Sequence, residues 1–101
     1  MKSLPIACTL GPAALKARRE GLLVNLVQRA QEHQEIPNGH RLRFAADGDI
    51  LLAIATTVEL ERQCCRFLQF TVTVAPDGGP ISLDLTGPPG SSEFVAALME
   101  P

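Results

Sequence analysis

The sequence is poor in aromatic residues, with four phenylalanines and neither tryptophan nor tyrosine. The stacking platform that proteins use to bind single-stranded nucleic acid is therefore absent. An excess of one charge is lacking too, because 9 basic and 11 acidic residues leave a net charge of −2. Without a basic patch, direct binding to nucleic acid is not expected.

Long apolar runs are also missing. Charged residues interrupt the apolar stretches well before the ~20 residues that a membrane span requires. Residues 1–8 lack the apolar segment and the cleavage site of a secretory signal. The cysteine count of three is odd, which does not suit a closed disulfide framework. We therefore expect a cytoplasmic protein with reduced thiols and no membrane contact.

Several motifs that mark enzymes are absent as well. The sequence has no nucleophile elbow, no glycine-rich phosphate-binding loop and no HExxH pattern. Gly78-Gly79 and the segment 87–90 are typical of turns. An enzyme is therefore not the favoured interpretation.

The elements that are present can be read from hydrophobic periodicity. A length of 101 residues predicts a single domain, 1–101, with one hydrophobic core. Apolar spacing of three and four predicts helices, and strict alternation predicts strands. In chain order the pattern predicts a strand at 4–10, a helix at 13–34, a strand at 40–45, a helix at 50–67, strands at 69–74 and 81–86, and a helix at 93–99.

This order, β-α-β-α-β-β-α, predicts a two-layer α/β sandwich of the α+β kind. The later strands alternate polar and apolar residues, so the helices should cover one face of a four-stranded sheet. A right-handed crossover would set strands 4–10 and 40–45 parallel, while 69–74 and 81–86 form an antiparallel hairpin, which makes the sheet mixed. The residues expected to face the core are Phe70, Val72, Val74, Ile81, Leu83 and Leu85.

The candidate functional residues gather at the end of helix 50–67. Glu61 lies three and four positions before Cys64 and Cys65, on nearly the same helical face. Two thiolates and a carboxylate suit Zn²⁺ or another thiophilic ion, although adjacent cysteines lack the spacing of a zinc knuckle. The other interpretation is core packing, since free cysteine is among the most buried residue types. On a continuous helix the two cysteines point about 100° apart, so only Cys65 should be central.

Glu61 is the one charged residue on the predicted inner stripe. That stripe consists of Leu51, Ile54, Val58, Glu61, Cys65 and Leu68. A carboxylate on an apolar stripe must be paired, bound to a ligand or protonated. Arg18, on the inner stripe of helix 13–34, is the leading protein partner. Arg62 and Arg66 bracket the cysteines and would favour thiolate, whereas His33 and His40 are expected to be exposed rather than ligands.

Cys8 ends the first predicted strand, shortly before a helix N-terminus. Exposed amides there would favour the thiolate, which supports thiol chemistry. The alternative is again a small buried residue on a strand.

The sequence resembles a family of small bacterial proteins found beside, or fused to, MerR-type regulators in mercury-resistance gene clusters. The resemblance spans nearly the whole chain and rests on Cys8-x-Leu10, on Thr86-Gly87-Pro88 and above all on Glu61-x-x-Cys64-Cys65-x-Phe67-x-x-Phe70. It implies a heavy-metal context, with Cys8, Cys64 and Cys65 as candidate ligands and a MerR-type regulator as a candidate partner.

The predicted fold is similar to that of TusA-like sulfur carriers and of the C-terminal domain of translation initiation factor 3. Sulfur carriers have Cys-x-x-Pro before their first helix, whereas here the run Cys8–Pro12 is one residue longer. In such a fold Cys8 and the cysteine pair lie at opposite ends of the second helix, about 22 Å apart at 1.5 Å per residue. A three-thiol site then needs a broken helix, another sheet order or a dimer.

Three functional hypotheses follow. The first is a protein that binds a thiophilic metal ion, of the Hg or Zn class, through Cys64 and Cys65 with Glu61 and Cys8. The second is a non-catalytic binding or oligomerisation module, for instance a homodimer, in which the cysteines only pack. The third is a sulfur carrier or redox protein that uses Cys8.

Overall fold

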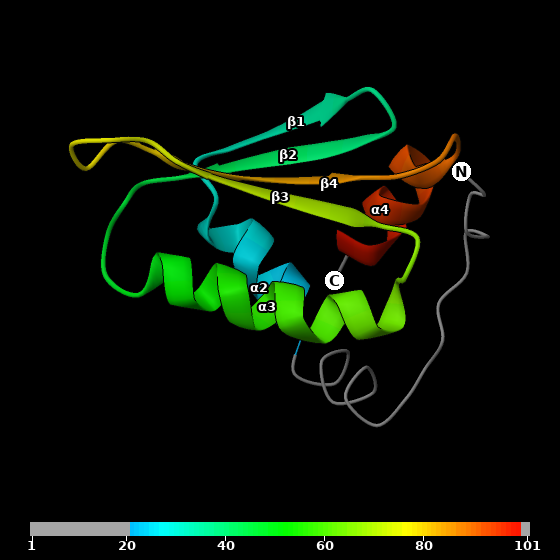
Figure 1. The fold of residues 1–101 in the computed structure, drawn as a ribbon, viewed down its shortest axis with the longest axis horizontal. Coiled ribbons are helices and arrows are strands. Elements are labelled where there is room, and N and C mark those ends of the chain that lie inside the picture. The colour runs from blue at the N-terminus through cyan, green and yellow to red at the C-terminus, as the bar shows by residue number, and fades with distance from the viewer. Residues whose placement is uncertain (1–20, 100–101) are drawn as a thin grey trace.

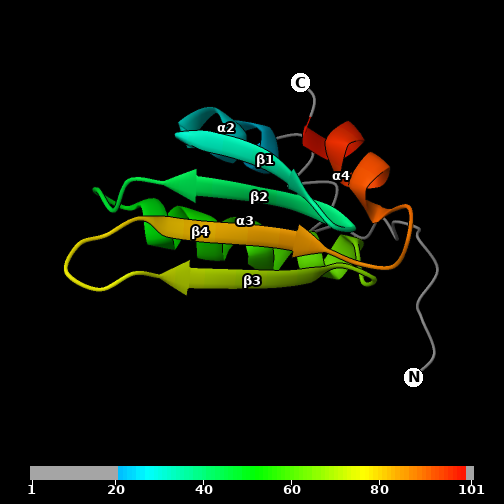
Figure 2. The same ribbon diagram turned by 90° about the horizontal axis from the view of Figure 1, so that it is seen from above.

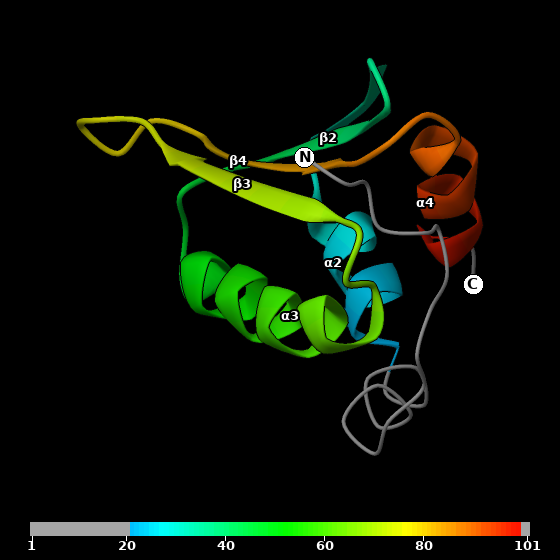
Figure 3. The same cartoon turned by 45° about the vertical axis from the view of Figure 1, so that its right-hand side comes forward.

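The computed structural model describes residues 21–99, whose elements form two layers (Figure 1). The elements are helix α2 (Leu22–Arg29), strands β1 (Glu32–Ile36) and β2 (Gly39–Phe44), helix α3 (Ile50–Cys64), strands β3 (Gln69–Val74) and β4 (Ile81–Thr86), and helix α4 (Ser91–Met99). The helices lie on one face of a four-stranded sheet (Figures 1 and 3). The predicted two-layer sandwich with helices on one face is confirmed.

The strand order across the sheet is β1-β2-β4-β3 (Figure 2). All three neighbouring pairs are antiparallel, so the prediction of a mixed sheet is wrong for the described strands. The sheet contains β1 in addition to the three strands predicted at 40–45, 69–74 and 81–86. Because β1 forms a hairpin with β2, no crossover connection joins the two. The strand predicted at 4–10 lies outside the described residues.

The main error concerns the predicted helix 13–34. Its described part ends at Arg29, and Ala30 already has the extended dihedrals φ −71 and ψ 139. The amide of Gln31 then donates to Arg43 O at 2.7 Å, which starts the pairing of β1 with β2. The residues of β1 are polar, like those on the solvent-facing side of a helix, and it is pairing with β2 that makes this segment a strand.

A tight turn joins β1 to β2 at Pro37 and Asn38. Asn38 has φ 58, and proline followed by a residue with positive φ is what a type II turn requires. Gly39 comes next, where β2 approaches β4 so closely that a Cβ atom would collide with Leu85 O. The predicted chain break at this turn was therefore right, although the element before it is a strand.

The core lies between the inner face of the sheet and the helices. It is formed by Leu23, Leu26, Leu42, Phe44, Ile50, Ile54, Cys64, Cys65, Phe67, Leu68, Ile81, Leu83, Leu85, Val95 and Met99. The core positions predicted on β4 are confirmed. On β3 the prediction is wrong for Val72 and Val74, which are 40% and 55% exposed. These two side chains lie on an edge strand that the described helices cover only partly.

Helix α3 is rotated relative to the predicted stripe and ends three residues earlier than expected. Its buried residues are Ile50, Ile54, Thr57, Glu61 and Cys64. Leu51, expected inside, is 45% exposed. The final helix begins at Ser91, two residues before the predicted start, and its Phe94 ring meets Phe67 edge-on at 4.9 Å. Within residues 21–99, no helix has the length and apolarity that crossing a bilayer demands.

Candidate functional sites

Both cysteines of the predicted site are buried. Cys64 is the last residue of α3, and Cys65 leaves the helix with φ −107 and ψ 75. Their exposed fractions are 1% and 0%. The expectation that only one of them could be central is wrong, because it assumed a helix that continued past Cys65. The end of α3 instead turns both side chains into the core.

Glu61 lies one turn before Cys64 on the same face of α3, and it is 2% exposed. Its carbonyl accepts the amide of Cys65 at 2.7 Å, which closes the last turn of the helix. The structure therefore brings a carboxylate and two thiols to one end of α3, inside the hydrophobic core. Cys64 and Cys65 are not joined to each other by a disulfide.

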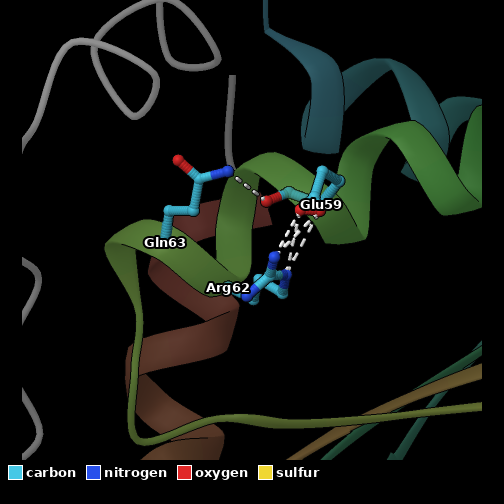
Figure 4. Close-up of polar contacts among 3 residues, drawn as sticks. All are labelled: Glu59, Arg62 and Gln63. Atoms are coloured by element: carbon cyan, nitrogen blue, oxygen red, sulfur yellow. Dashed lines mark hydrogen bonds and ion pairs between the residues drawn. The ribbon is translucent and has the colours of Figure 1, made fainter.

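Of the two arginines expected to favour thiolate at this site, Arg66 is exposed and Arg62 points away from the thiols. Arg62 is bound to Glu59 on the exposed side of α3, with Nε 3.1 Å from Oε1, and Gln63 donates to Glu59 O (Figure 4). This pairing raises the pKa of Arg62 and lowers that of Glu59, in both cases chiefly through their hydrogen bond. The charge of Arg62 is thus neutralised locally and turned away from the buried thiols.

The positions of two other residues predicted at this site are not described. Cys8 and the proposed ion-pair partner Arg18 both lie outside the described residues. Within the described part of the chain, no group of three or more His, Cys, Asp or Glu side chains is placed to hold a metal ion. The structure therefore brings Glu61, Cys64 and Cys65 to one end of α3 without arranging them as a three-donor metal site.

A second polar cluster connects β1, β2 and α4. His40 Nε2 lies 2.9 Å from Ser92 O, and His40 Nδ1 lies 2.9 Å from His33 Nε2. The Ser92 hydroxyl donates to Glu35 Oε2 at 2.6 Å. We call these four residues, His33, Glu35, His40 and Ser92, the histidine cluster. It ties the β1–β2 hairpin to the first turn of α4.

The hydrogen bonds of the histidine cluster fix the position of one proton. A carbonyl oxygen only accepts, so His40 Nε2 carries a proton for Ser92 O. His40 Nδ1 and His33 Nε2 share one further hydrogen bond, in which the ring tautomers decide the donor. Burial, and next the neighbouring His40 ring, lower the pKa of His33 below its ordinary value of 6.5. Protonation of His33 is thus less favourable in the folded chain than in the unfolded chain.

The prediction that His33 and His40 are both exposed is wrong for His40, which is 7% exposed. A sequence signal for this existed. His40 precedes Leu42 and Phe44 by two and four positions, so a strand that directs these two residues inward directs His40 inward as well. No comparable signal marked His33, because its strand was taken for a helix.

A shallow cleft of about 340 Å³ separates α2 from α3. It is lined in part by Leu22, Leu26 and Leu52, and Arg29 binds Asp49 across its rim at 2.8 Å. This pair joins the last turn of α2 to the residue that precedes α3, and it lowers the pKa of Asp49, mainly through the hydrogen bond from Arg29. The cleft carries no group that suggests chemistry.

Four large apolar side chains of the described residues are exposed, namely Leu51, Leu52, Val72 and Val74. Val72 and Val74 lie on the inner face of the edge strand β3. Leu51 is on the flank of α3 away from α2, since Leu52 lines the α2–α3 cleft and Leu51 does not. The opposite flank of α3, with Asp49 and Ala53, faces α2 across the cleft. We call Leu51, Val72 and Val74 the β3 strip, and Figure 2 shows β3 at one edge of the sheet that the described strands form.

Comparison with known proteins adds nothing to this geometry. No family model, curated protein or solved structure matches this chain. Its function therefore has to be argued from the two buried sites and the β3 strip themselves.

Proposed function

We propose that this chain is a non-catalytic module of the cytoplasm that associates with a second copy of itself along the β3 strip. The observation that carries the proposal is the exposure of Leu51, Val72 and Val74, at 45%, 40% and 55%, next to a strand edge that no other described strand pairs with. Single exposed apolar residues are common on protein surfaces, but an apolar strip that borders unpaired strand backbone marks an association surface.

In this proposal the cysteines serve the core. Cys64 and Cys65 are part of the hydrophobic cluster beneath the sheet, together with Phe67 and Leu68. Reduced cysteine packs as a small apolar residue, and the reducing cytoplasm keeps it so. The end of α3 then anchors the start of β3 and positions the edge strand.

The test compares two neighbouring leucines of α3. Leu51 belongs to the β3 strip, whereas Leu52 is 68% exposed on the side that borders the α2–α3 cleft. We expect the average mass of the wild-type chain to rise with concentration in sedimentation equilibrium. Leu51→Lys should suppress this rise, and the matched control Leu52→Lys should not. A wild-type chain that remains monomeric up to about 500 µM, well above micromolar affinities, or an equal effect of both variants, would contradict the proposal.

A second candidate function is binding of a thiophilic metal ion by Cys64 and Cys65, with Glu61 and Cys8 as further donors. The observation that favours it is that Cys64 and Cys65 are adjacent at the end of α3, with Glu61 one turn before them. Two thiolates are sufficient for a soft ion such as Hg²⁺, and Zn²⁺ would need further donors. The mercury-resistance resemblance adds a MerR-type regulator as the partner.

Native mass spectrometry separates the two candidates. The wild-type chain and a Cys64→Ser/Cys65→Ser variant are each titrated with Hg²⁺ and with Zn²⁺. Metal binding by the pair predicts that the wild-type chain retains one ion that the variant loses. Equal uptake by both proteins would eliminate the metal function. The sulfur-carrier alternative depends on Cys8, outside the described residues, and stays a prediction.

A further inference from the structure

The two edges of the sheet differ in their protection against pairing with another strand. The β1 edge carries Glu32 and Glu35, and charged side chains are a common device against edge-to-edge contact. The β3 edge, Gln69–Val74, has no charged residue and no proline, and its pairing with β4 runs without a bulge. Within residues 21–99, one edge is therefore protected by charge, and the other is open.

The backbone groups on the open edge can be assigned. Ala75 N donates to Pro80 O at 3.2 Å, which makes Ala75 and Pro80 a hydrogen-bonded pair of the β3–β4 hairpin. Such pairs alternate along an antiparallel ladder. The N–H and C=O groups of Phe70, Val72 and Val74 therefore point away from β4, toward the open side.

We propose that a second copy of this chain pairs with β3 in antiparallel orientation, about a two-fold axis at Val72, and that this forms a continuous eight-stranded sheet. The inference rests on the association proposed above and specifies its strand pairing and register. In this register Val72 meets itself, Phe70 meets Val74 on the inner face, and Thr71 meets Thr73 on the outer face. Apolar and Thr–Thr cross-strand pairs of this kind stabilise sheets, and a two-fold contact must be self-complementary in this way.

Charge outside the strand supports the same orientation. Arg66 lies just before β3 and Asp77 just after it, and both side chains are exposed. In an antiparallel pair, the start of one β3 meets the end of the other, so opposite charges come together at both ends. A parallel pair would instead bring like charges together. With a net charge of only −2, the chain offers little general repulsion against its own copy.

The size of the contact sets its strength. Two six-residue strands with a flanking leucine give an interface at the low end of the range for specific complexes. We therefore expect a dissociation constant of about 1–100 µM. In sedimentation, Val72→Lys should weaken the dimer at least tenfold, because the two lysines would meet at the axis. Gln34→Lys, on the protected edge, should leave the dissociation constant unchanged.

The register is tested by two cysteine substitutions in a Cys8→Ser background. Residues 72 of the two copies would face each other about 5.5 Å apart, which suits a disulfide. Residues 74 would lie four positions apart along the strands, about 13 Å, which no disulfide spans. Mild oxidation should therefore link the Val72→Cys chain into a dimer and leave the matched Val74→Cys chain unlinked.

The outcomes distinguish this inference from the function on which it rests. If the wild-type chain self-associates but Val72→Cys is not linked, or Val74→Cys is linked equally well, the two-fold pairing at Val72 is wrong and association by another contact remains. If the wild-type chain stays monomeric at all concentrations, both the pairing and self-association through the β3 strip are wrong.

Discussion

Replacing His40 by alanine tests the histidine cluster most directly. The imidazole is 7% exposed and lies on β2, between β1 and α4. Its removal breaks the bond with His33 at 2.9 Å and the bond to Ser92 O at 2.9 Å. The substitution therefore disconnects the β1–β2 hairpin from α4 and leaves Ser92 O without this donor.

The expected loss of stability follows from these contacts. Each net hydrogen bond contributes about 0.5–1.5 kcal/mol, and the lost packing of the buried ring adds to this. We expect His40→Ala to lower the free energy of unfolding by about 2–4 kcal/mol. His33→Ala removes one bond from a more exposed ring and should cost about 1 kcal/mol. Because the residues are in contact, the double variant should lose less than the sum of the single variants.

The same cluster makes stability depend on pH. The pKa of His33 is lower in the folded chain than its ordinary value of 6.5, so between these two pKa values the unfolded chain binds more protons. The His33 contribution is therefore complete above pH 6.5 and is lost as the pH falls through 6.5 toward the folded pKa. The acidic member of the cluster, Glu35, accepts the hydrogen bond of the Ser92 hydroxyl.

Urea denaturation at pH 7.5 and pH 5.5 measures both effects. The wild-type chain should lose stability between these pH values, and His40→Ala should lose less, because the ring that disfavours protonated His33 is gone. Glu59 and Asp49 do not interfere, since their lowered pKa values place their titration at more acidic pH. A loss below about 0.5 kcal/mol in His40→Ala, or equal pH dependence in both proteins, would refute the reasoning.

Three further substitutions test other parts of the structure. Gly39→Ala should cost about 3 kcal/mol or prevent folding, because the new Cβ meets the Leu85 backbone; a Tm near that of the wild type would contradict this. Cys65→Ala should lower the free energy of unfolding by about 1–3 kcal/mol in chemical denaturation. In the wild-type chain, the thiol of Cys65 should react with DTNB only after unfolding. Rapid labelling of Cys65 in the native chain would show that this thiol is not buried in the core. Arg62→Ala breaks only the exposed pair with Glu59 and should leave both the stability in the same assay and the rate of DTNB labelling unchanged.

The sequence predicted the hairpin β3–β4 to the residue, because the alternation of apolar and polar side chains and the turn at 75–80 specify it locally. It failed at β1, whose polar residues have no strand pattern of their own. There the pairing with β2 determines that the segment is a strand, through contacts such as Glu32 opposite Arg43. A local periodicity cannot reveal an edge strand that owes its form to its neighbour.

At the candidate site, too, the sequence predicted some features and missed others. The spacing of Glu61, Cys64 and Cys65 predicted that a carboxylate and thiols would share one end of the helix, and all three are buried there. The spacing did not predict that the helix would stop at Cys64, so it placed only one thiol in the core. The histidine cluster was missed because its four residues come from β1, β2 and α4, and only folding brings them together.

The sequence alone determined which segments are amphipathic, where the Pro- and Gly-rich turns fall and which thiols lie next to an acid, because these properties depend on neighbours within one or two turns of chain. The tertiary structure alone decided which of the described strands lie at the edges of the sheet, how α3 is rotated and which histidine is buried. These properties depend on contacts between residues far apart in the chain, such as His40 with Ser92. Their energies exist only once the helices have packed on the sheet.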